Sequence, residues 1–477
     1  MGQILALKKN DELELTIDDL GKDGEGIGHV DGYALFVKEA LPGELVRVKV
    51  MKTKKGYGFA RLMEILRPSP ARVPPRCPVA RQCGGCTLQH LSYEAQLIFK
   101  EKKVMDCLSR IGGIDLNEVC VLPVLGMKEP WNYRNKAQFP VRADKSGNPV
   151  IGFYAGRTHS IIPVTDCCIQ TPEMQPILEC VMRFMREHKI SAYNEEAHIG
   201  LIRHIFIRCA KATGEIMVCF VLNGNERTFI RQFGTDFIKE LREASPSIAS
   251  ILVNVNCERT NVIMGKTTSI LWGKESIVDK IGGIQYEISA HSFYQVNPTQ
   301  TIRLYETALD FAGLTGREIV WDMYCGIGTI SLFLAQKASK VFGVEIVPQA
   351  IKDARRNARL NGITNTEFFC GAAEDVVGSE QVSSRIGEDA MHADVIVVDP
   401  PRKGCDSSLL ETIRHMAPKR IVYVSCDPAT LARDIKVLGD DASGDRGRYV
   451  VEKVRVCDMF PGGGHVETVV GLQRKDM

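Results

Sequence analysis

The sequence predicts a multi-domain α/β protein with an N-terminal β-barrel, a central α+β domain and a C-terminal domain built on a parallel, doubly wound sheet. Glycines divide residues 1–66 into short strand-like runs, as in small barrels of the oligonucleotide-binding type. Four prolines between positions 68 and 75 indicate a stiff linker. From about residue 291, strand-like and helix-like runs alternate. We therefore expect domains at 1–66, 67–290 and 291–477.

The individual elements follow from the spacing of apolar residues. In the first domain, alternating or apolar runs predict strands at Glu12–Ile17, Ala34–Val37, Leu45–Val50 and Phe59–Ile65. Apolar residues at helical spacing predict a helix over residues 91–111, which we expect to pack on the C-terminal domain. For that domain the sequence predicts strands at Ile319–Asp322, Lys340–Glu345, Val395–Val398 and Arg420–Ser425, and a terminal hairpin over about 455–470.

Composition and charge point away from a membrane protein and leave a nucleic-acid partner open. No apolar run among the 477 residues is long enough to cross a bilayer, and the N-terminus has no signal-peptide pattern, so we expect a cytoplasmic protein. Between Arg47 and Lys145 there are 19 Lys and Arg against 8 Asp and Glu, a net +11 within a chain of net +2. This excess suits a phosphate-binding face, although a solvated basic surface without a partner would look the same.

The first half of the C-terminal domain carries a pattern for a nucleoside cofactor. The strand Ile319–Asp322 runs into a turn with Gly326 and Gly328, and glycines there allow a tight turn close to a ligand. Glu345 ends the next strand, where a carboxylate can accept hydrogen bonds from two ribose hydroxyls. Asp399 follows a buried strand and is held by two prolines. A dinucleotide dehydrogenase is the main competing interpretation, and Asp399 could instead only cap its strand.

Two residues of the second half suggest covalent catalysis. Cys426 follows the strand Arg420–Ser425 at the same expected sheet edge and precedes a helix start at Pro428, which would lower the pKa of its thiol. Glu467 lies in an apolar strand, where it is either a surface residue or a general base. Uracil C5 is a poor nucleophile until a thiolate adds to C6. Methylation at C5 then needs one cysteine, one base and a methyl donor.

Five motifs, in the same order, resemble those of the uracil-5 RNA methyltransferases: Ser292–Asn297, Asp322–Gly328, Asp399–Arg402, Ser425–Asp434, and Asp458–Pro461 with His465–Glu467. The resemblance spans nearly the whole chain and implies a Rossmann-like class I methyltransferase domain. It implies that Cys426 is the nucleophile, Glu467 the proton-abstracting base and Phe293 an aromatic that stacks on the flipped uracil. It further implies that S-adenosylmethionine is bound by Gln295, Tyr324, Glu345 and Asp399.

The chain departs from the family pattern at three places. Thr329 stands where some members have Asn, and Asp427 stands where Asn is frequent, a change that we expect to be tolerated. Gly462–Gly464 replace a bulkier loop, and three consecutive glycines predict a loose connection to Glu467.

The cysteines at 77, 83 and 86 can converge on one metal centre, because five and two residues separate them. Four thiolates also suit zinc, and metal-free cysteines are a third possibility. The resemblance implies a [4Fe–4S] cluster whose fourth ligand is Cys167, with Cys168 as the adjacent rival. We expect a role in folding or RNA positioning rather than redox catalysis.

Residues 1–66 resemble the TRAM domain, a β-barrel attached to several RNA-modifying enzymes. Tyr57 and Phe59 stand there among basic residues that could hold phosphates, namely Arg47, Lys49, Lys52, Lys54, Lys55 and Arg61. The domain favours 23S ribosomal RNA as the substrate. Alternatives are a tRNA uridine-C5 methyltransferase, methylation of an exocyclic nitrogen, and an RNA-binding assembly factor without catalysis. We expect a monomer without an obligate protein partner.

Overall fold

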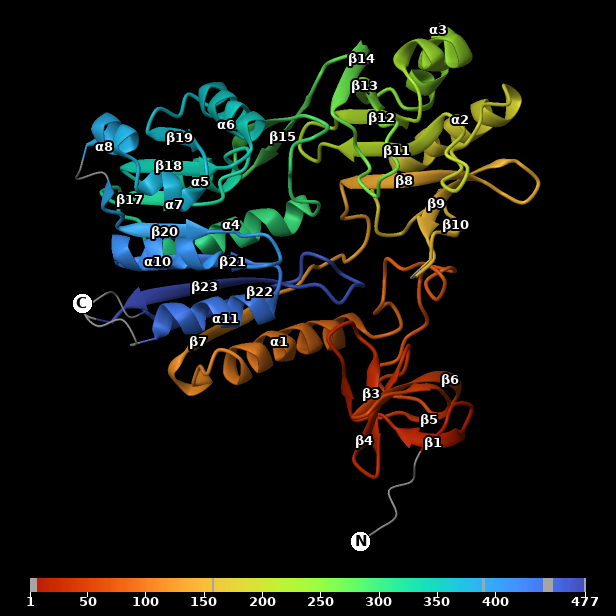
Figure 1. The fold of residues 1–477 in the computed structure, drawn as a ribbon, viewed down its shortest axis with the longest axis horizontal. Helices are drawn as coiled ribbons and strands as arrows, with labels where there is room; N and C mark the ends of the chain where they lie inside the picture. The colour runs from red at the N-terminus through yellow and green to blue at the C-terminus, as the bar shows by residue number, and fades with distance from the viewer. Residues whose placement is uncertain (1–6, 157, 388–390, 441–448, 476–477) are drawn as a thin grey trace.

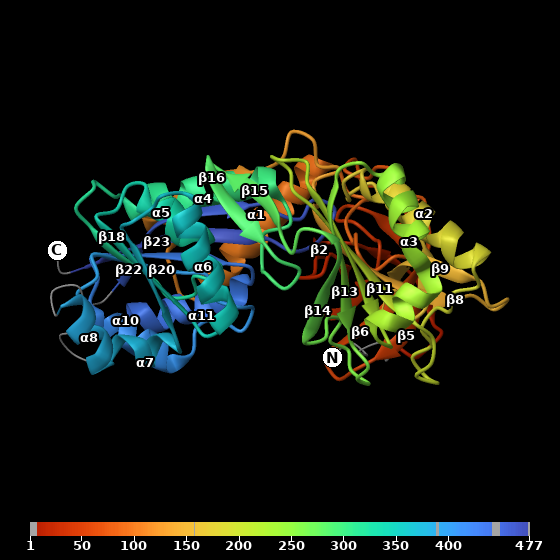
Figure 2. The same ribbon diagram turned by 90° about the horizontal axis from the view of Figure 1, so that it is seen from above.

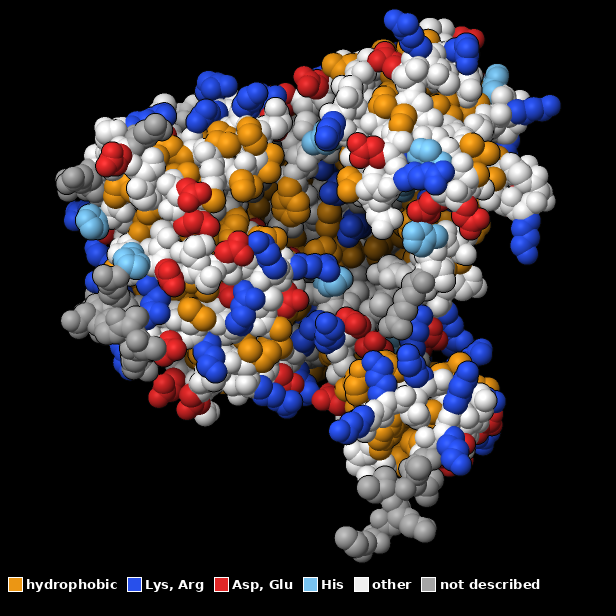
Figure 3. All heavy atoms as spheres, viewed as in Figure 1, with side chains coloured by type: hydrophobic (Ala, Val, Ile, Leu, Met, Phe, Trp, Pro, Cys, Tyr) orange, Lys and Arg blue, Asp and Glu red, His pale blue; other side chains and the backbone are white. Residues whose placement is uncertain are grey.

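The computed structural model describes residues 7–156, 158–387, 391–440 and 449–475. Three sheets form the centres of three bodies, which Figure 1 shows as the N-terminal barrel, the central sheet and the C-terminal sheet with its helices. The space-filling view in Figure 3 is hollowed where these three bodies meet. Among the described residues, no helix is both long enough and apolar enough to cross a membrane.

The N-terminal sheet has six strands in the order β1-β5-β6-β4-β3-β2. Its strands are β1 (Glu12–Thr16), β2 (Asp19–Leu20), β3 (Gly26–Val30), β4 (Tyr33–Val37), β5 (Leu45–Thr53) and β6 (Tyr57–Arg67). The four expected strands are confirmed. Strand β3 was not predicted, because it begins Gly-Ile-Gly and glycine is uncommon inside strands. A Cβ at Gly26 or Gly28 would collide with neighbouring backbone, so the two glycines allow close packing of this strand.

The central sheet has seven strands in the order β10-β9-β8-β11-β12-β13-β14. Its strands are β8 (Lys136–Ala143), β9 (Pro149–Tyr154), β10 (Ile161–Pro163), β11 (Ile202–Cys209), β12 (Ile216–Leu222), β13 (Ile248–Val255) and β14 (Thr267–Gly273). Helices α2 (Met174–Glu187) and α3 (Glu226–Ala244) pack on this sheet through a shared apolar core, and Figure 2 shows both on its outer side.

The C-terminal sheet has eight strands in the order β19-β18-β17-β20-β21-β23-β22-β7. Its strands are β7 (Cys120–Leu125), β17 (Ile319–Asp322), β18 (Lys340–Glu345), β19 (Thr366–Cys370), β20 (Val395–Val398), β21 (Arg420–Ser425), β22 (Tyr449–Cys457) and β23 (Glu467–Arg474). The strands predicted here are confirmed, but the sheet is mixed: β23 runs antiparallel to β21. Strand β7 contains Pro123 and forms the edge, where a proline can be accommodated.

Helices cover both faces of the C-terminal sheet, as expected for a doubly wound fold. They are α4 (Pro298–Ala312), α5 (Thr329–Ala335), α6 (Pro348–Leu360), α7 (Ala373–Val377), α8 (Glu380–Ile386), α10 (Ser407–Met416) and α11 (Pro428–Gly439). Successive residues of β20 alternate between two separate apolar cores, one containing residues of α4 to α6 and the other residues of α7, α10 and α11.

Parts of the segment 67–290 pack on the C-terminal sheet rather than on the central one. Helix α1 (Tyr93–Arg110) lies against α11, and a short 3-10 helix (Leu116–Glu118) leads from it into β7. The hairpin of β15 (Ile277–Ile281) and β16 (Ile284–Ile288) packs on α6. The segment 67–290 therefore contacts the C-terminal sheet and its helices at two places.

Candidate active site

The carboxyl ends of the parallel strands bring the predicted site residues to one sheet edge. Asp322 ends β17, Glu345 ends β18, and Asp399 and Cys426 directly follow β20 and β21. In the turn after β17, Gly328 has a φ of 85° and is the N-cap of α5. This left-handed conformation strongly favours glycine and lets the chain turn directly from strand to helix.

Two carboxyl groups at this edge hold their protons unusually tightly. Burial raises the pKa of Asp322 to about 6, against a 2.6 Å hydrogen bond that the Ser331 hydroxyl donates to it. Burial among protein atoms also raises the pKa of Asp399 to about 7, and the charge of Asp322 adds to this effect. Both shifts mean that a negative charge here is poorly compensated in the ligand-free protein. The edge therefore suits a ligand that carries positive charge or hydroxyl donors.

Cys426 is half-buried, and its thiol is not activated in the way that we predicted. Burial raises its pKa to about 11, and the carboxylates of Glu467 and Asp399 contribute. The expected lowering by the start of α11 is wrong, because the Asp427 side chain occupies that position: it accepts hydrogen bonds from the backbone N–H groups of Ala429 and Thr430 at 2.9 and 3.2 Å. Asp427 thus caps the helix, as expected for a tolerated replacement of Asn.

Glu467 is 4% exposed and opens strand β23, where it pairs across the hairpin with Cys457. Burial raises the pKa of its carboxyl well above the ordinary value, and the charge of Asp399 adds to the effect. The Arg402 guanidinium opposes the rise at Glu467 and also at Cys426. The structure thus brings Cys426, Glu467 and Asp399 within electrostatic reach of one another. We had not predicted a role for Arg402. Its position in the Asp-Pro-Pro-Arg motif, directly after Asp399, was the pattern that could have indicated one.

The remaining predicted cofactor and substrate residues lie on two other segments, one after β17 and one between β16 and α4. The side chain of Tyr324 is half-buried beside Cys405 and Asp406. Gln295 is buried, and its backbone carbonyl accepts a 3.2 Å hydrogen bond from the Asn135 side chain. Phe293 is 66% exposed, which is unusual for such a large apolar side chain. No hydrogen bond or ion pair among the described residues joins Phe293 or Gln295 to Cys426.

Two apolar residues beside Glu345 were not predicted. Ile346 and Val347 follow the tip of β18 and are 68% and 50% exposed. The backbone N–H of Val347 donates a 2.9 Å hydrogen bond to the Glu345 carboxylate, which fixes the side chain at the strand end. In the sequence, the pattern that could have indicated them is the Ile-Val pair directly after Glu345. Such a pair offers an apolar surface to a flat ligand, next to a carboxylate that can accept hydrogen bonds from hydroxyl groups.

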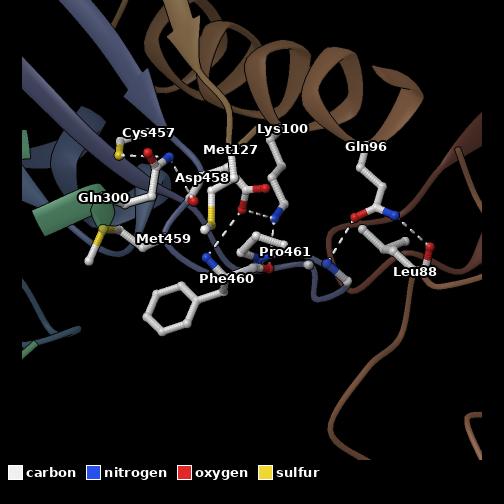
Figure 4. Close-up of polar contacts among 12 residues, drawn as sticks. Leu88, Gln96, Lys100, Met127, Gln300, Cys457, Asp458, Met459, Phe460 and Pro461 are labelled. Atoms are coloured by element: carbon white, nitrogen blue, oxygen red, sulfur yellow. Dashed lines mark hydrogen bonds and ion pairs between the residues drawn. The ribbon is translucent and has the colours of Figure 1, made fainter. Parts of the chain in front are cut away.

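The loop that leads from β22 to Glu467 is held in place, so the prediction of a loose connection is wrong. Figure 4 shows that helix α1 provides the partners. Lys100 donates to the Asp458 carboxylate at 2.5 Å, and the side-chain oxygen of Gln96 accepts a 2.9 Å bond from the backbone N–H of Gly462. The glycines are thus fixed by side chains that are distant in sequence, which local patterns could not indicate.

Five cysteines from two distant segments converge beside this loop. Burial raises the pKa of Cys86 to about 12 and that of Cys167 to about 11. Neighbouring thiols add to both shifts: Cys83, Cys167 and Cys168 act on Cys86, and Cys77 and Cys168 act on Cys167. Within the described parts of the chain, no three His, Cys, Asp or Glu side chains already stand in a metal-binding arrangement.

The barrel presents aromatic rings towards residues 77–91, which we call the cysteine segment. Phe36, Tyr57 and Phe59 contact one another with ring centroids 5.7 to 5.8 Å apart. A cavity of about 460 Å³ separates Phe36 and Phe59 from the cysteine segment. Basic side chains gather on the barrel in Figure 3, although some of them are neutralised: Arg47 pairs with Glu64 at 2.6 Å and Lys49 with Glu12 at 3.0 Å.

Comparison with known proteins gives a consistent result over the whole chain. Residues 249–475 match the family model described as tRNA (Uracil-5-)-methyltransferase, and residues 6–63 match the TRAM domain. An uncharacterized RNA methyltransferase of Halalkalibacterium halodurans is 52% identical over 470 residues, covering 98% of each chain. One of Clostridium acetobutylicum is 45% identical over 476 residues, covering all of both chains.

Among solved structures, the chain resembles the crystal structure of Pyrococcus abyssi tRNA (uracil-54, C5)-methyltransferase in complex with S-adenosyl-L-homocysteine. The two are 30% identical with a TM-score of 0.74, and the match covers 96% of this chain and all of the other. The similarity therefore extends over nearly the whole chain.

Replacing Asp399 by Asn should make the ligand-free protein less sensitive to high pH. The folded carboxyl has a pKa of about 7 against an ordinary value of 3.8, so its stabilising proton is fully present below about pH 4 and is lost as the pH rises through 7. In melting curves between pH 4.5 and 8.5, we expect the Asp399→Asn variant to exceed the wild type by a few degrees above pH 7. The difference should shrink towards pH 4.5. The exposed Asp310→Asn variant is the control, and parallel pH profiles for Asp399→Asn and wild type would contradict the assignment.

Proposed function

The chain belongs to the family of TRAM-domain-containing RNA (uracil-5-)-methyltransferases, and from this premise we propose that it methylates C5 of a uridine in 23S ribosomal RNA through a covalent adduct on Cys426. Members of the family take the methyl group from S-adenosylmethionine. The observation that carries the proposal is the convergence of Cys426, Glu467 and Asp399 at one sheet edge. It supplies the thiol and the base that C5 methylation requires.

Cys426 is the proposed nucleophile. Its thiol first gives up a proton to solvent, to which the half-exposed side chain has access, and Arg402 stabilises the thiolate that remains. The sulfur then bonds to C6 of the uracil, and the C5–C6 electron pair moves towards O4 as an enolate. C5, now nucleophilic, bonds to the methyl carbon of the donor, which leaves as S-adenosylhomocysteine.

Glu467 is the proposed base that completes the reaction. After methylation, C5 still carries a proton that must leave before the sulfur can be released. The Glu467 carboxylate accepts that proton, the C5–C6 double bond re-forms and the C6–S bond breaks, which returns the thiolate. A buried carboxylate with a raised pKa is a stronger base than an exposed one, which suits proton removal near neutral pH.

The sheet edge fits S-adenosylmethionine, which supplies an electrophilic methyl group on a positively charged sulfur. We assign Glu345, Asp399, Gln295 and Tyr324 to its binding. The carboxyl groups of Asp322 and Asp399 support this assignment, because burial raises their pKa values to about 6 and about 7 and a bound cation would oppose that rise. The exposed apolar side chain of Ile346 beside Glu345 is suited to a flat adenine ring. Phe293 is assigned to stacking on the target uracil, because its ring is exposed at the start of the same motif as Gln295.

Two RNA classes compete as substrate. The aromatic rings and basic side chains of the barrel support a single-stranded RNA region, which large ribosomal RNA offers in its loops. A tRNA is the second candidate, because the similar Pyrococcus abyssi enzyme is a tRNA (uracil-54, C5)-methyltransferase.

Cys77, Cys83, Cys86 and Cys167 are the proposed ligands of a [4Fe–4S] cluster, with zinc as the alternative. The donor set supports the proposal, since burial and neighbouring thiols raise the pKa values of Cys83, Cys86 and Cys167, and a bound cation would relieve both effects. Cys168 remains the rival of Cys167, but it is the acceptor of a 3.7 Å contact from the Gln89 amide. The cysteine segment contacts the loop before Glu467, since the backbone N–H of Leu88 donates a 2.9 Å hydrogen bond to the Gly462 carbonyl. A cluster that fixes the cysteine segment would therefore also support this loop.

Replacing Cys426 by Ala should abolish methylation, because no other group forms the bond to C6. The assay incubates purified enzyme with labelled methyl donor and with either 23S ribosomal RNA or tRNA from a strain that lacks the gene. Wild type should label the 23S RNA, and Cys426→Ala should label neither. Cys120→Ala, an exposed thiol on β7, is the control and should keep full activity. Retained activity in Cys426→Ala would indicate methylation of a nitrogen, and labelling of tRNA alone would reassign the substrate.

Replacing Glu467 by Gln should trap the RNA on the protein. The amide keeps the shape of the side chain but cannot accept the C5 proton, so turnover should fall about 10²- to 10⁴-fold. Denaturing gels followed by mass spectrometry should find methylated RNA bound to Cys426. The exposed Glu452→Gln on β22 should behave as wild type. Recovery of only free, unmethylated RNA would contradict the role.

Anaerobically purified protein should be brown, with an absorption that bleaches in air. The expected iron and sulfide contents are about four of each per chain, as the formula of a [4Fe–4S] cluster requires. Replacing Cys86, one of the proposed ligands, by Ser should remove both the colour and the iron. Colourless protein with one zinc per chain would establish the alternative.

A further inference from the structure

One face of helix α1 contacts the loop that leads to Glu467. Gln96, Lys100 and Lys103 are spaced four and three residues apart, so their side chains lie on the same face of the helix. All three reach residues 458–464, which connect β22 to β23 and which we call the catalytic loop. Figure 4 shows Gln96 and Lys100 extending from the helix towards this loop.

Lys100 fixes the beginning of the catalytic loop. Its ammonium donates to the carboxylate of Asp458 at 2.5 Å and to the backbone carbonyl of Phe460 at 2.9 Å. Neither the Lys100 nor the Asp458 side chain is exposed. The Tyr93 hydroxyl, also on α1, donates to the second oxygen of Asp458 at 3.0 Å. Asp458 directly follows Cys457, which is the strand partner of Glu467, so this end of the loop is anchored next to the proposed base.

Gln96 and Lys103 fix the rest of the catalytic loop. The Gln96 side-chain oxygen accepts from Gly462 N–H, and its amide donates to two carbonyls of the cysteine segment at 2.8 and 3.0 Å. Lys103 donates to the Gly464 carbonyl at 2.9 Å and to the Lys22 carbonyl in the barrel at 2.8 Å. The helix therefore contacts the loop at every second residue from 458 to 464.

The contacts between α1 and the catalytic loop define the path of that loop more than they stabilise the folded protein. A buried ion pair is a weak source of stability, because desolvation of the two charges offsets their attraction. Three consecutive glycines also carry the largest loss of backbone freedom on folding, so the loop has no conformational preference of its own. What the α1 contacts supply is one defined path for the chain between two strands, and Glu467 stands at the end of that path.

We propose that Gln96, Lys100 and Lys103 are positioning residues for the removal of the C5 proton. The inference rests on the proposed role of Glu467 and adds that the carboxylate is aligned by α1 through the catalytic loop. Proton transfer depends steeply on alignment, and a displacement of about 1 Å can slow a step about 10²-fold. Loss of an α1 contact should therefore slow release of methylated RNA while leaving formation of the adduct on Cys426 intact.

Lys103→Met is the most informative variant, because Lys100→Met would leave Asp458 buried without its partner and could prevent folding. The test compares Lys103→Met, Lys103→Arg and Lys102→Met in the full-length enzyme. Lys102 lies on the same helix, is exposed and pairs with Asp19, so it is a matched control. Single-turnover assays measure how fast methylated RNA forms and how fast it leaves Cys426. Hydrogen exchange measures, without any catalysis, the protection of the Gly462 and Gly463 amides, which donate to Gln96 and to Phe460.

For Lys103→Met, we expect adduct formation and the KM for RNA to stay within about twofold of wild type. Release should slow about 10- to 100-fold, so that methylated adduct accumulates, and exchange in the catalytic loop should be faster. Lys103→Arg should restore release, and Lys102→Met should change nothing. Unchanged loop exchange, or equal losses in formation and release, would overturn the inference.

The Glu467→Gln variant separates this inference from the proposal on which it rests. If Glu467→Gln traps methylated RNA and Lys103→Met does not, the positioning role is wrong while the base is correct. If Glu467→Gln traps nothing, the role of Glu467 fails and the positioning role fails with it.

Discussion

The constraint on which the site depends is the free-energy cost of holding several buried carboxyl groups at one sheet edge, where the Arg402 guanidinium opposes the raised pKa values of Glu467 and Cys426. Burial raises the pKa values of Asp322, Asp399 and Glu467, and their charges oppose one another. A cluster of buried carboxyl groups destabilises the ligand-free protein, and such clusters are typical of sites where a ligand compensates their charge. A cationic methyl donor and a carbon acid that must lose its proton would both do so, and the fold places these carboxyls where the parallel strands end.

The N-terminal half contributes more than an RNA-binding surface. Helix α1 and strand β7 cross to the C-terminal sheet. The barrel carbonyl of Lys22 accepts from Lys103, which also holds the catalytic loop, and the cysteine segment contacts that loop through Leu88. RNA bound on the barrel would therefore act on elements that touch the loop before Glu467. This connection gives a physical reason for keeping the three bodies in one chain, beyond the extra affinity of a second RNA-binding surface.

Sequence patterns predicted what depends on local periodicity and on the geometry of parallel sheets. The tips at Asp322, Glu345, Asp399 and Cys426 were predictable because carboxyl ends of parallel strands meet at one edge. Contacts between segments hundreds of residues apart were not: Lys100 and Asp458 show no mutual signal in the sequence. The pKa of Cys426 was also missed, because it depends on burial and on the carboxyls of Glu467 and Asp399, which come from other strands of the sheet.

That raised pKa has a consequence for how the reaction begins. With a pKa raised to about 11, the Cys426 thiol is protonated at pH 7, so the resting sulfur reacts slowly with oxidants and other electrophiles. Arg402 alone does not overcome burial and two nearby carboxylates. Under the proposed mechanism, loss of the thiol proton to solvent is favoured on binding, when the carboxyls around the thiol gain positive charge or hydrogen-bond donors and cease to oppose the thiolate. Burial and these carboxyls would thereby restrict the reactivity of the proposed nucleophile to the moment when donor and uridine are both in place.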